Sequence, residues 1–135
     1  MEPITWTDDF SVGVAAIDAQ HKTLIAMINQ LIREPSAAAR SETVNKLLSE
    51  MSDYALLHFQ AEETLMAAHN YPHIEEQITM HRAFHTKTIR FCIDVLYRDE
   101  ALPGVMLTYL RDWWTHHILE EDKKYSAFFR ERGVT

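Results

Sequence analysis

Residues 58–62 read HFQAE, which places His58 and Glu62 one helical turn apart. On an α-helix, residues i and i+4 lie on the same face, so both side chains can point at one spot. His81 and His85 repeat this spacing further along the chain. Helical bundles hold metal ions with inward-facing donors of this kind, and a buried carboxylate without a partner is strongly unfavourable. The spacing therefore predicts helices that carry metal ligands into the core of a bundle.

Two further segments supply donors of the same type. His21 stands in an earlier amphipathic segment, and His117 is followed by Glu120, Glu121 and Asp122. Imidazole nitrogen suits iron, zinc, copper and nickel, whereas bridging carboxylates suit hard or borderline ions. Several histidines combined with two carboxylates indicate two ions that share bridging oxygens, rather than one tetrahedral zinc.

The composition excludes several other classes of protein. A chain of 135 residues is long enough for one domain with a real core, and a net charge of −7 argues against binding nucleic acid or anionic lipid. The single Cys92 cannot form an internal disulfide and fits a reducing compartment. Neither a signal peptide nor a membrane-spanning stretch is evident. We expect a cytoplasmic protein without a membrane partner; its oligomeric state stays open, and a monomer is compatible with the sequence.

The pattern of apolar residues predicts an all-α protein, an up-down-up-down four-helix bundle with an extended N-terminal arm. With only 3 Gly and 4 Pro, the chain has little material for the turns of a sandwich or barrel. We expect a single domain over residues 1–135, with Asp18 capping the first helix. The predicted segments are an arm over about 1–17 and helices over about 18–33, 38–69, 72–98 and 105–130.

Short motifs follow one another in a fixed order along nearly the whole chain. They are Trp6, the segments 12–14 (VGV) and 17–22 (IDAQHK), 58–63 (HFQAEE) with Met66, Tyr71-Pro72, and Trp113 to Ile118 with Asp122 and Tyr125. In this order they resemble the bacterial hemerythrins, which are non-haem di-iron oxygen-binding four-helix bundles. Because several spaced motifs agree, the resemblance is far more specific than any isolated pair of residues.

The resemblance implies a ligand set for two iron ions. One iron would be held by His21 and His58 and would keep an open position for O₂. The second iron would take donors from the third helix together with His117. Glu62 and Asp122 would bridge the two ions, with an oxo or hydroxo group between them.

The fourth helix presents a geometric difficulty at this ligand set. An ideal α-helix puts Glu121, not Asp122, on the face of His117, because five residues rotate the side chain by about 140°. The family pattern favours Asp122. A locally widened turn would reconcile the two, and we assign Asp122 to the site.

The third helix departs from the family pattern, which has His-x-x-x-His at fixed distances after the Tyr-Pro turn. Those positions hold Gln77 and His81 here. His85 would restore the pair only if the helix slid by one turn, about 6 Å, and the unchanged spacing from Glu62 to Tyr71 leaves no room for that slide. We therefore place Gln77 and His81 at the site, where either the Gln77 amide oxygen is a weak ligand or water fills the gap. The alternative, His81 and His85 in a shifted register, stays open.

Apolar side chains flank the predicted ligands and could form a dry pocket for O₂. They are Phe59, Trp113, Trp114, Ile118 and Leu24. Each of them would equally suit the core of any bundle. Trp114 occupies a position that is often leucine in the family, and its bulk could narrow the route for O₂.

Taken together, these residues favour a binding protein over an enzyme. We expect reversible O₂ binding at a di-iron centre for transport, storage or sensing. The alternatives are a di-iron enzyme with peroxidase, oxidase or nitric-oxide-handling activity, and a degenerate metal-binding bundle. Ferritin-like oxidases carry a Glu-x-x-His motif on each of two helices, and no Glu in this chain is followed by His three residues later.

Overall fold

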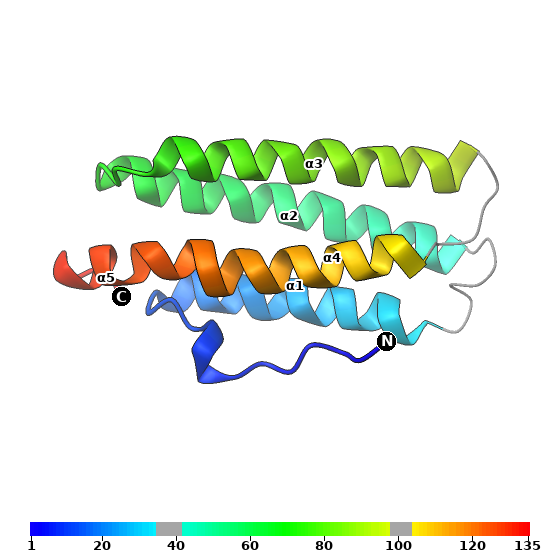
Figure 1. The fold of residues 1–135 in the computed structure, drawn as a ribbon, viewed down its shortest axis with the longest axis horizontal. Coiled ribbons are helices and arrows are strands. Elements are labelled where there is room, and N and C mark those ends of the chain that lie inside the picture. The colour runs from blue at the N-terminus through cyan, green and yellow to red at the C-terminus, as the bar shows by residue number, and fades with distance from the viewer. Residues whose placement is uncertain (35–41, 98–103) are drawn as a thin grey trace.

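The protein is described by a computed structural model that covers residues 1–34, 42–97 and 104–135 (Figure 1). Within these ranges, all regular structure is helical, which confirms the predicted all-α class. The elements are η1 (Asp8–Phe10), α1 (Ala15–Arg33), α2 (Glu42–Ala68), α3 (Ile74–Tyr97), α4 (Gly104–His116), η3 (His117–Asp122) and α5 (Lys123–Glu131). No helix in the described ranges has the length and apolar character needed to cross a lipid bilayer.

The helices form an antiparallel four-helix bundle, as predicted. Neighbours in the sequence run in opposite directions, and α4, η3 and α5 follow one another as the fourth rod (Figure 1). Helix α1 packs against α2 and α4, and α2 packs against α3. Each helix therefore turns one face to the common core, where donors from all four rods can meet.

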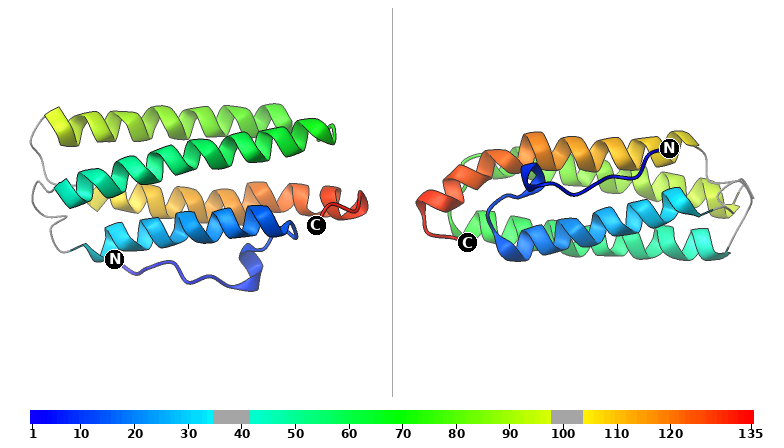
Figure 2. Two further views of the ribbon diagram at one scale, coloured as in Figure 1. Left: turned by 180° about the vertical axis from the view of Figure 1, so that it is seen from behind. Right: turned by 90° about the horizontal axis from the view of Figure 1, so that it is seen from below.

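The N-terminal arm runs along the face formed by α1 and α4, as the view from below shows (Figure 2). Asn29 fixes its start, because its side chain accepts from the Ile4 N–H at 2.7 Å and donates to the Ile4 carbonyl at 2.8 Å. Phe10 is buried in the main apolar cluster, and Trp6 stacks on it with ring centroids 5.6 Å apart. The arm thus covers the core instead of hanging free.

The predicted cap at Asp18 is wrong, because α1 starts three residues earlier, at Ala15. The Asp18 N–H already donates to the Val14 carbonyl at 2.9 Å, so Asp18 lies inside the first turn. Its carboxylate accepts from the Val12 N–H at 2.8 Å and from the Ser11 hydroxyl at 2.6 Å. Asp18 therefore anchors the arm, while its charge suits the positive end of the helix dipole.

The turn between α2 and α3 also shifts the predicted helix ends. Asn70 adopts a left-handed conformation with φ of 55°, and the Tyr71 N–H donates back to the Met66 carbonyl at 2.9 Å. This is a Schellman-type C-cap, so α2 ends at Ala68 and α3 starts at Ile74. Residues 38–41 and 98, which belong to predicted helices, lie outside the described residues.

The buried apolar side chains form two clusters, one along most of the bundle and one at the end near the Tyr71 turn. On α1, Leu24 belongs to the first cluster and Ile17 to the second, and His21 lies between them. On α2, Glu62 lies in the same way between Phe59 and Met66. The predicted ligands therefore occupy a polar layer between two apolar layers.

Candidate metal centre

The seven side chains predicted as ligands come together in this polar layer. They are His21, His58, Glu62, Gln77, His81, His117 and Asp122, none more than 3% exposed. They reach it from α1, α2, α3 and η3. Burying so many polar groups is unfavourable unless each finds a partner, which makes their contacts informative.

The first group of donors consists of His21, His58, Glu62 and Asp122, whose ligand atoms all lie within 4.8 Å of one another. His58 Nε2 is 2.6 Å from Glu62 Oε1, and His21 Nε2 is 3.2 Å from Asp122 Oδ2. Two imidazoles and two carboxylates therefore converge on one point. We call this point the first position.

The second group consists of Glu62, His81 and His117, which meet the same 4.8 Å limit. The Nε2 atoms of His81 and His117 are 3.2 Å apart, and His117 Nε2 is also 3.2 Å from Asp122 Oδ1. We call this point the second position. Glu62 belongs to both groups, and Asp122 faces His21 with one oxygen and His117 with the other, so both carboxylates have the placement that bridging requires.

A π-helix brings His117 and Asp122 to the same side. In η3, hydrogen bonds run from residue i to i+5, so residues five apart face one direction. Asp122 is fully buried, whereas Glu121 points outward and accepts from Lys124 Nζ at 3.0 Å. The structure thus contains the locally widened turn that the sequence required.

On α3, the structure brings Gln77 and His81 to the centre. Gln77 Nε2 donates to Asp122 Oδ1 at 3.1 Å, while its buried Oε1 has no hydrogen-bond partner among the described residues. His85 is half-buried and lines a groove between α2 and α3 instead. The unshifted register places one amide where the family pattern has an imidazole.

Three supporting residues were not assigned roles from the sequence. Gln20 Oε1 lies 2.7 Å from His58 Nδ1, and Glu63 Oε2 lies 2.9 Å from His81 Nδ1. The Tyr125 hydroxyl donates to Glu62 Oε2 at 2.7 Å. Each contact joins two different helices, so no spacing within one helix predicts it. The available signal was that Gln20, Glu63 and Tyr125 all belong to the motifs that resemble the hemerythrins.

The imidazoles and carboxylates of the centre shift one another's pKa values. Burial by itself would lower the pKa of His117, but Asp122 and Glu62 outweigh it and raise this pKa. Burial lowers the pKa of His81, which favours the neutral imidazole that a metal needs. Burial by itself would raise the pKa of Asp122, but His117 and His21 outweigh it and hold this pKa well below its usual value. Burial, with the charges of Asp122 and Glu62, raises the pKa of Tyr125 well above its usual value. Tyr125 therefore remains a hydroxyl donor to Glu62.

The hydrogen-bonding state of four buried atoms at the first position indicates whether a cation would fit there. His21 Nε2, His58 Nε2, Glu62 Oε1 and Asp122 Oδ2 have no hydrogen-bond partner of adequate geometry in the described part of the chain. Buried polar atoms are normally paired, and unpaired ones need an explanation. A cation at their meeting point would satisfy all four. Mixed imidazole and carboxylate donors suit borderline ions such as iron, so the residues fit the metal that the sequence implied.

The five predicted pocket residues all pack in the main apolar cluster. Phe59 stacks on His81 and Trp113 on His117, with ring centroids 3.9 and 4.4 Å apart, so both cover the second position. Trp114 lies beside the first position, its ring 5.8 Å from that of His58. Leu24 and Ile118 are fully buried with it. Their role around O₂ stays a prediction, but the apolar surroundings are present.

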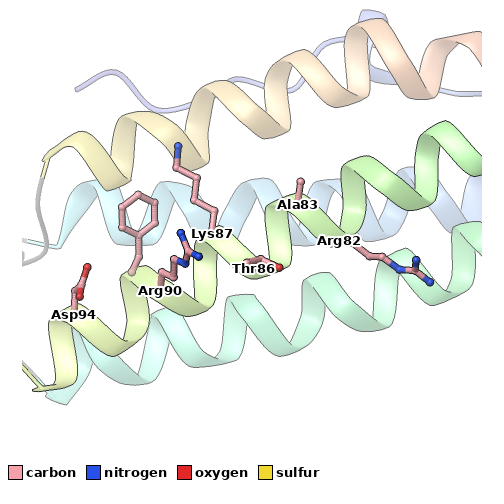
Figure 3. Close-up of a pocket in the computed structure, with 7 residues that line it drawn as sticks. Arg82, Ala83, Thr86, Lys87, Arg90 and Asp94 are labelled. Carbon is pink, nitrogen blue, oxygen red and sulfur yellow. The ribbon is translucent and has the colours of Figure 1, made fainter.

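A large surface hollow lies elsewhere, along α3 (Figure 3). Its volume is about 670 Å³, and none of the seven predicted ligands lines it. Its lining residues are Arg82, Ala83, Thr86, Lys87, Arg90, Phe91 and Asp94. In Figure 3, Lys87 reaches toward α4, where its ammonium lies 4.2 Å from the Tyr109 ring centroid. The candidate centre is thus a buried layer, separate from this opening.

Fold and donors together define a metal-binding four-helix bundle. The family model described as the hemerythrin HHE cation binding domain matches residues 12–129, and the chain belongs to the hemerythrin family. It is 35% identical to a bacteriohemerythrin of Methylococcus capsulatus over 93% of this chain and 95% of that one. It is 27% identical to a bacteriohemerythrin of Clostridium acetobutylicum over 89% and 96% of the two chains.

A solved structure agrees with these relatives. The crystal structure of a wild-type hemerythrin superposes with a TM-score of 0.86 at 27% sequence identity. The match covers 93% of this chain and 97% of that one. The four-helix arrangement is therefore shared along nearly the full length of both proteins.

Proposed function

We propose that this protein binds O₂ reversibly at a non-haem di-iron centre built in the polar layer. One observation carries the proposal: four fully buried donor atoms of His21, His58, Glu62 and Asp122, none with a hydrogen bond of adequate geometry in the described residues, converge at the first position. Membership of the hemerythrin family supports it. Transport, storage and sensing are three uses of this same binding reaction.

In this proposal, each position has its own histidines. His21 and His58 would hold the first ion, and His81 and His117 would hold the second, with Glu62 and Asp122 shared. The Gln77 amide is the additional group near the second ion. When bound, a pair of reduced iron ions supplies an open coordination position and the electrons for reversible O₂ binding.

Other residues of the chain orient the ligands and keep water away from them. The Tyr125 hydroxyl holds Glu62 in place through Oε2, which leaves Oε1 turned to the donors of both positions. Trp114, which is fully buried with its ring 5.8 Å from that of His58, would exclude water there. Water and protons promote the release of bound O₂ as a reduced species, which would leave the iron oxidised. An apolar wall disfavours this reaction and therefore supports reversible binding of O₂.

The test is the addition of O₂ to the reduced, iron-loaded protein under anaerobic conditions, followed by visible spectroscopy. The reduced protein should be nearly colourless, and O₂ should produce an absorption band that disappears on deoxygenation. An irreversible change with turnover of a reductant would replace this proposal with the enzyme alternative. Metal analysis that finds a single zinc would contradict the di-iron centre. A cytoplasmic location belongs to the proposal and rests on the single Cys92, which cannot form an internal disulfide and fits a reducing compartment.

A further inference from the structure

One histidine from each position is held from outside by a side chain of a different charge. His58 Nδ1 lies 2.7 Å from the neutral amide oxygen of Gln20. His81 Nδ1 lies 2.9 Å from the carboxylate oxygen of Glu63. In both imidazoles, the opposite nitrogen, Nε2, faces the ligand group. The two rings are therefore placed alike but supported differently.

The outer contacts decide how each ring binds a metal. An amide oxygen and a carboxylate can only accept, so each Nδ1 must carry the hydrogen and each Nε2 must turn its lone pair inward. A carboxylate partner increases the basicity of a ligating imidazole, and losing such a partner typically lowers metal affinity 10- to 100-fold. An uncharged amide polarises the ring less. His81 is therefore the more strongly activated donor.

Glu63 lies at the edge of the centre, where its side chain is partly exposed. Its side chain is 30% exposed, whereas that of His81 is 3% exposed. Glu63 lines the same groove as Arg82 and His85, so its carboxylate reaches solvent while it touches a buried ring. Glu63 is thus more exposed to solvent than the buried carboxylates of Glu62 and Asp122.

The charged support coincides with the weaker ligand set. The second position has an amide, Gln77, in place of the imidazole of the family pattern, and it is the position whose histidine contacts Glu63. We propose that Glu63 is a positioning residue that strengthens His81 as a ligand and thereby offsets the lack of an imidazole at Gln77. This inference rests on the proposed di-iron function.

The experiment is chelator competition on the iron-loaded protein, which separates the two ions by their rates and extents of release. Glu63→Gln removes the charge but keeps the size of the side chain. It should weaken retention of one ion 10- to 100-fold and leave the other unchanged. Glu50→Gln is the matched control, because Glu50 lies on the same helix and pairs with surface Lys46 at 3.8 Å. This control should release both ions like the wild type.

A second measurement, the reduction potential of the centre, distinguishes this role from a merely structural one. Losing the carboxylate should raise the potential in Glu63→Gln, because a less basic ligand stabilises the ferric state less. Gln20→Glu gives His58 a carboxylate partner and should lower the potential. Opposite shifts would not follow from a general loosening of the bundle. If Glu63→Gln loses helical content, the sign of the Gln20→Glu shift decides the question.

The outcomes separate this inference from the function on which it rests. Wild-type retention and potential in Glu63→Gln, with two ions bound, would overturn the role of Glu63 alone. A wild-type chain that takes up only one ion would overturn the di-iron centre, and the role of Glu63 with it. Selective loss of one ion together with opposite potential shifts would establish the proposal.

Discussion

The two positions of the centre share Glu62 and Asp122 but differ in every other contact. The first position has His21 and His58, a neutral support from Gln20 and the indole of Trp114 beside it. The second has His81 and His117, a charged support from Glu63 and a buried amide, Gln77. The bundle thus places two similar groups of donors side by side, but different side chains contact each group.

In the proposed di-iron centre, this difference would make the two ions unequal although their groups of donors are similar. The shared carboxylates couple the positions, so an effect on Glu62 reaches both. The outer contacts act on one histidine each, so they can adjust one ion without the other. The following predictions separate shared from individual contributions, from the largest expected effect to the smallest.

The largest effect should come from Glu62→Ala, which removes the carboxylate common to both groups of donors. Most of the metal should dissociate, because neither position keeps its bridging oxygen and the remaining histidines are left without a shared charge. Iron analysis after reconstitution measures this. Glu50→Ala, on the same helix, should retain full iron. Full occupancy in Glu62→Ala would contradict the shared bridge.

His58→Ala should separate the positions, because His58 belongs only to the first group. We expect loss of one of the two ions and complete loss of the reversible colour change with O₂. His73→Ala is a suitable control, because His73 is exposed and contacts Glu76 at 3.4 Å on the surface. A normal O₂ response in His58→Ala would mean that O₂ does not bind at the first position.

Gln77→His should reduce the difference between the positions. Imidazole is a better donor than an amide for Fe(II), so retention of the second ion should rise by roughly 10-fold, with the first ion unchanged. Chelator competition measures both. His85→Ala tests the register of α3 in the same assay and should change nothing, since His85 lines the outer groove. Loss of one ion in His85→Ala would mean that His81 and His85 are the ligands.

The smallest effect should come from Trp114→Phe, at the apolar wall of the first position. Trp114 is fully buried, and its Nε1–H has no hydrogen-bond partner among the described residues. Removing an unpaired donor recovers about 1–3 kcal/mol, which offsets much of the packing energy that the larger indole ring provides. The unfolding free energy from denaturant titration should therefore change little. Trp114→Leu, which leaves a larger void, should be clearly less stable. A large loss of stability in Trp114→Phe would instead indicate that the Nε1–H has a hydrogen-bond partner in the folded protein.

The sequence by itself determined the helices and the chemistry they carry. The shared face of His58 and Glu62 follows from helix geometry alone. The widened turn between His117 and Asp122 was expected because the resemblance to the hemerythrins assigns Asp122, whereas helix geometry favours Glu121. The departure at Gln77 was also visible from the sequence, because the family pattern has a histidine at this distance from the Tyr71 turn. These features depend on residues close together in the sequence, so they can be predicted without knowing how the helices pack.

Only the tertiary structure decided which groups support the donors. The contacts of Gln20 with His58, Glu63 with His81 and Tyr125 with Glu62 all cross between helices. They depend on how far each helix is rotated and shifted against its neighbour, and the packing of the whole core sets both. The start of α1 at Ala15 was missed for a related reason, because the Asp18 carboxylate binds the arm and does not cap the helix. The spacing along one helix determines which side chains share a face, whereas the packing of the core determines which residues of the neighbouring helices they contact.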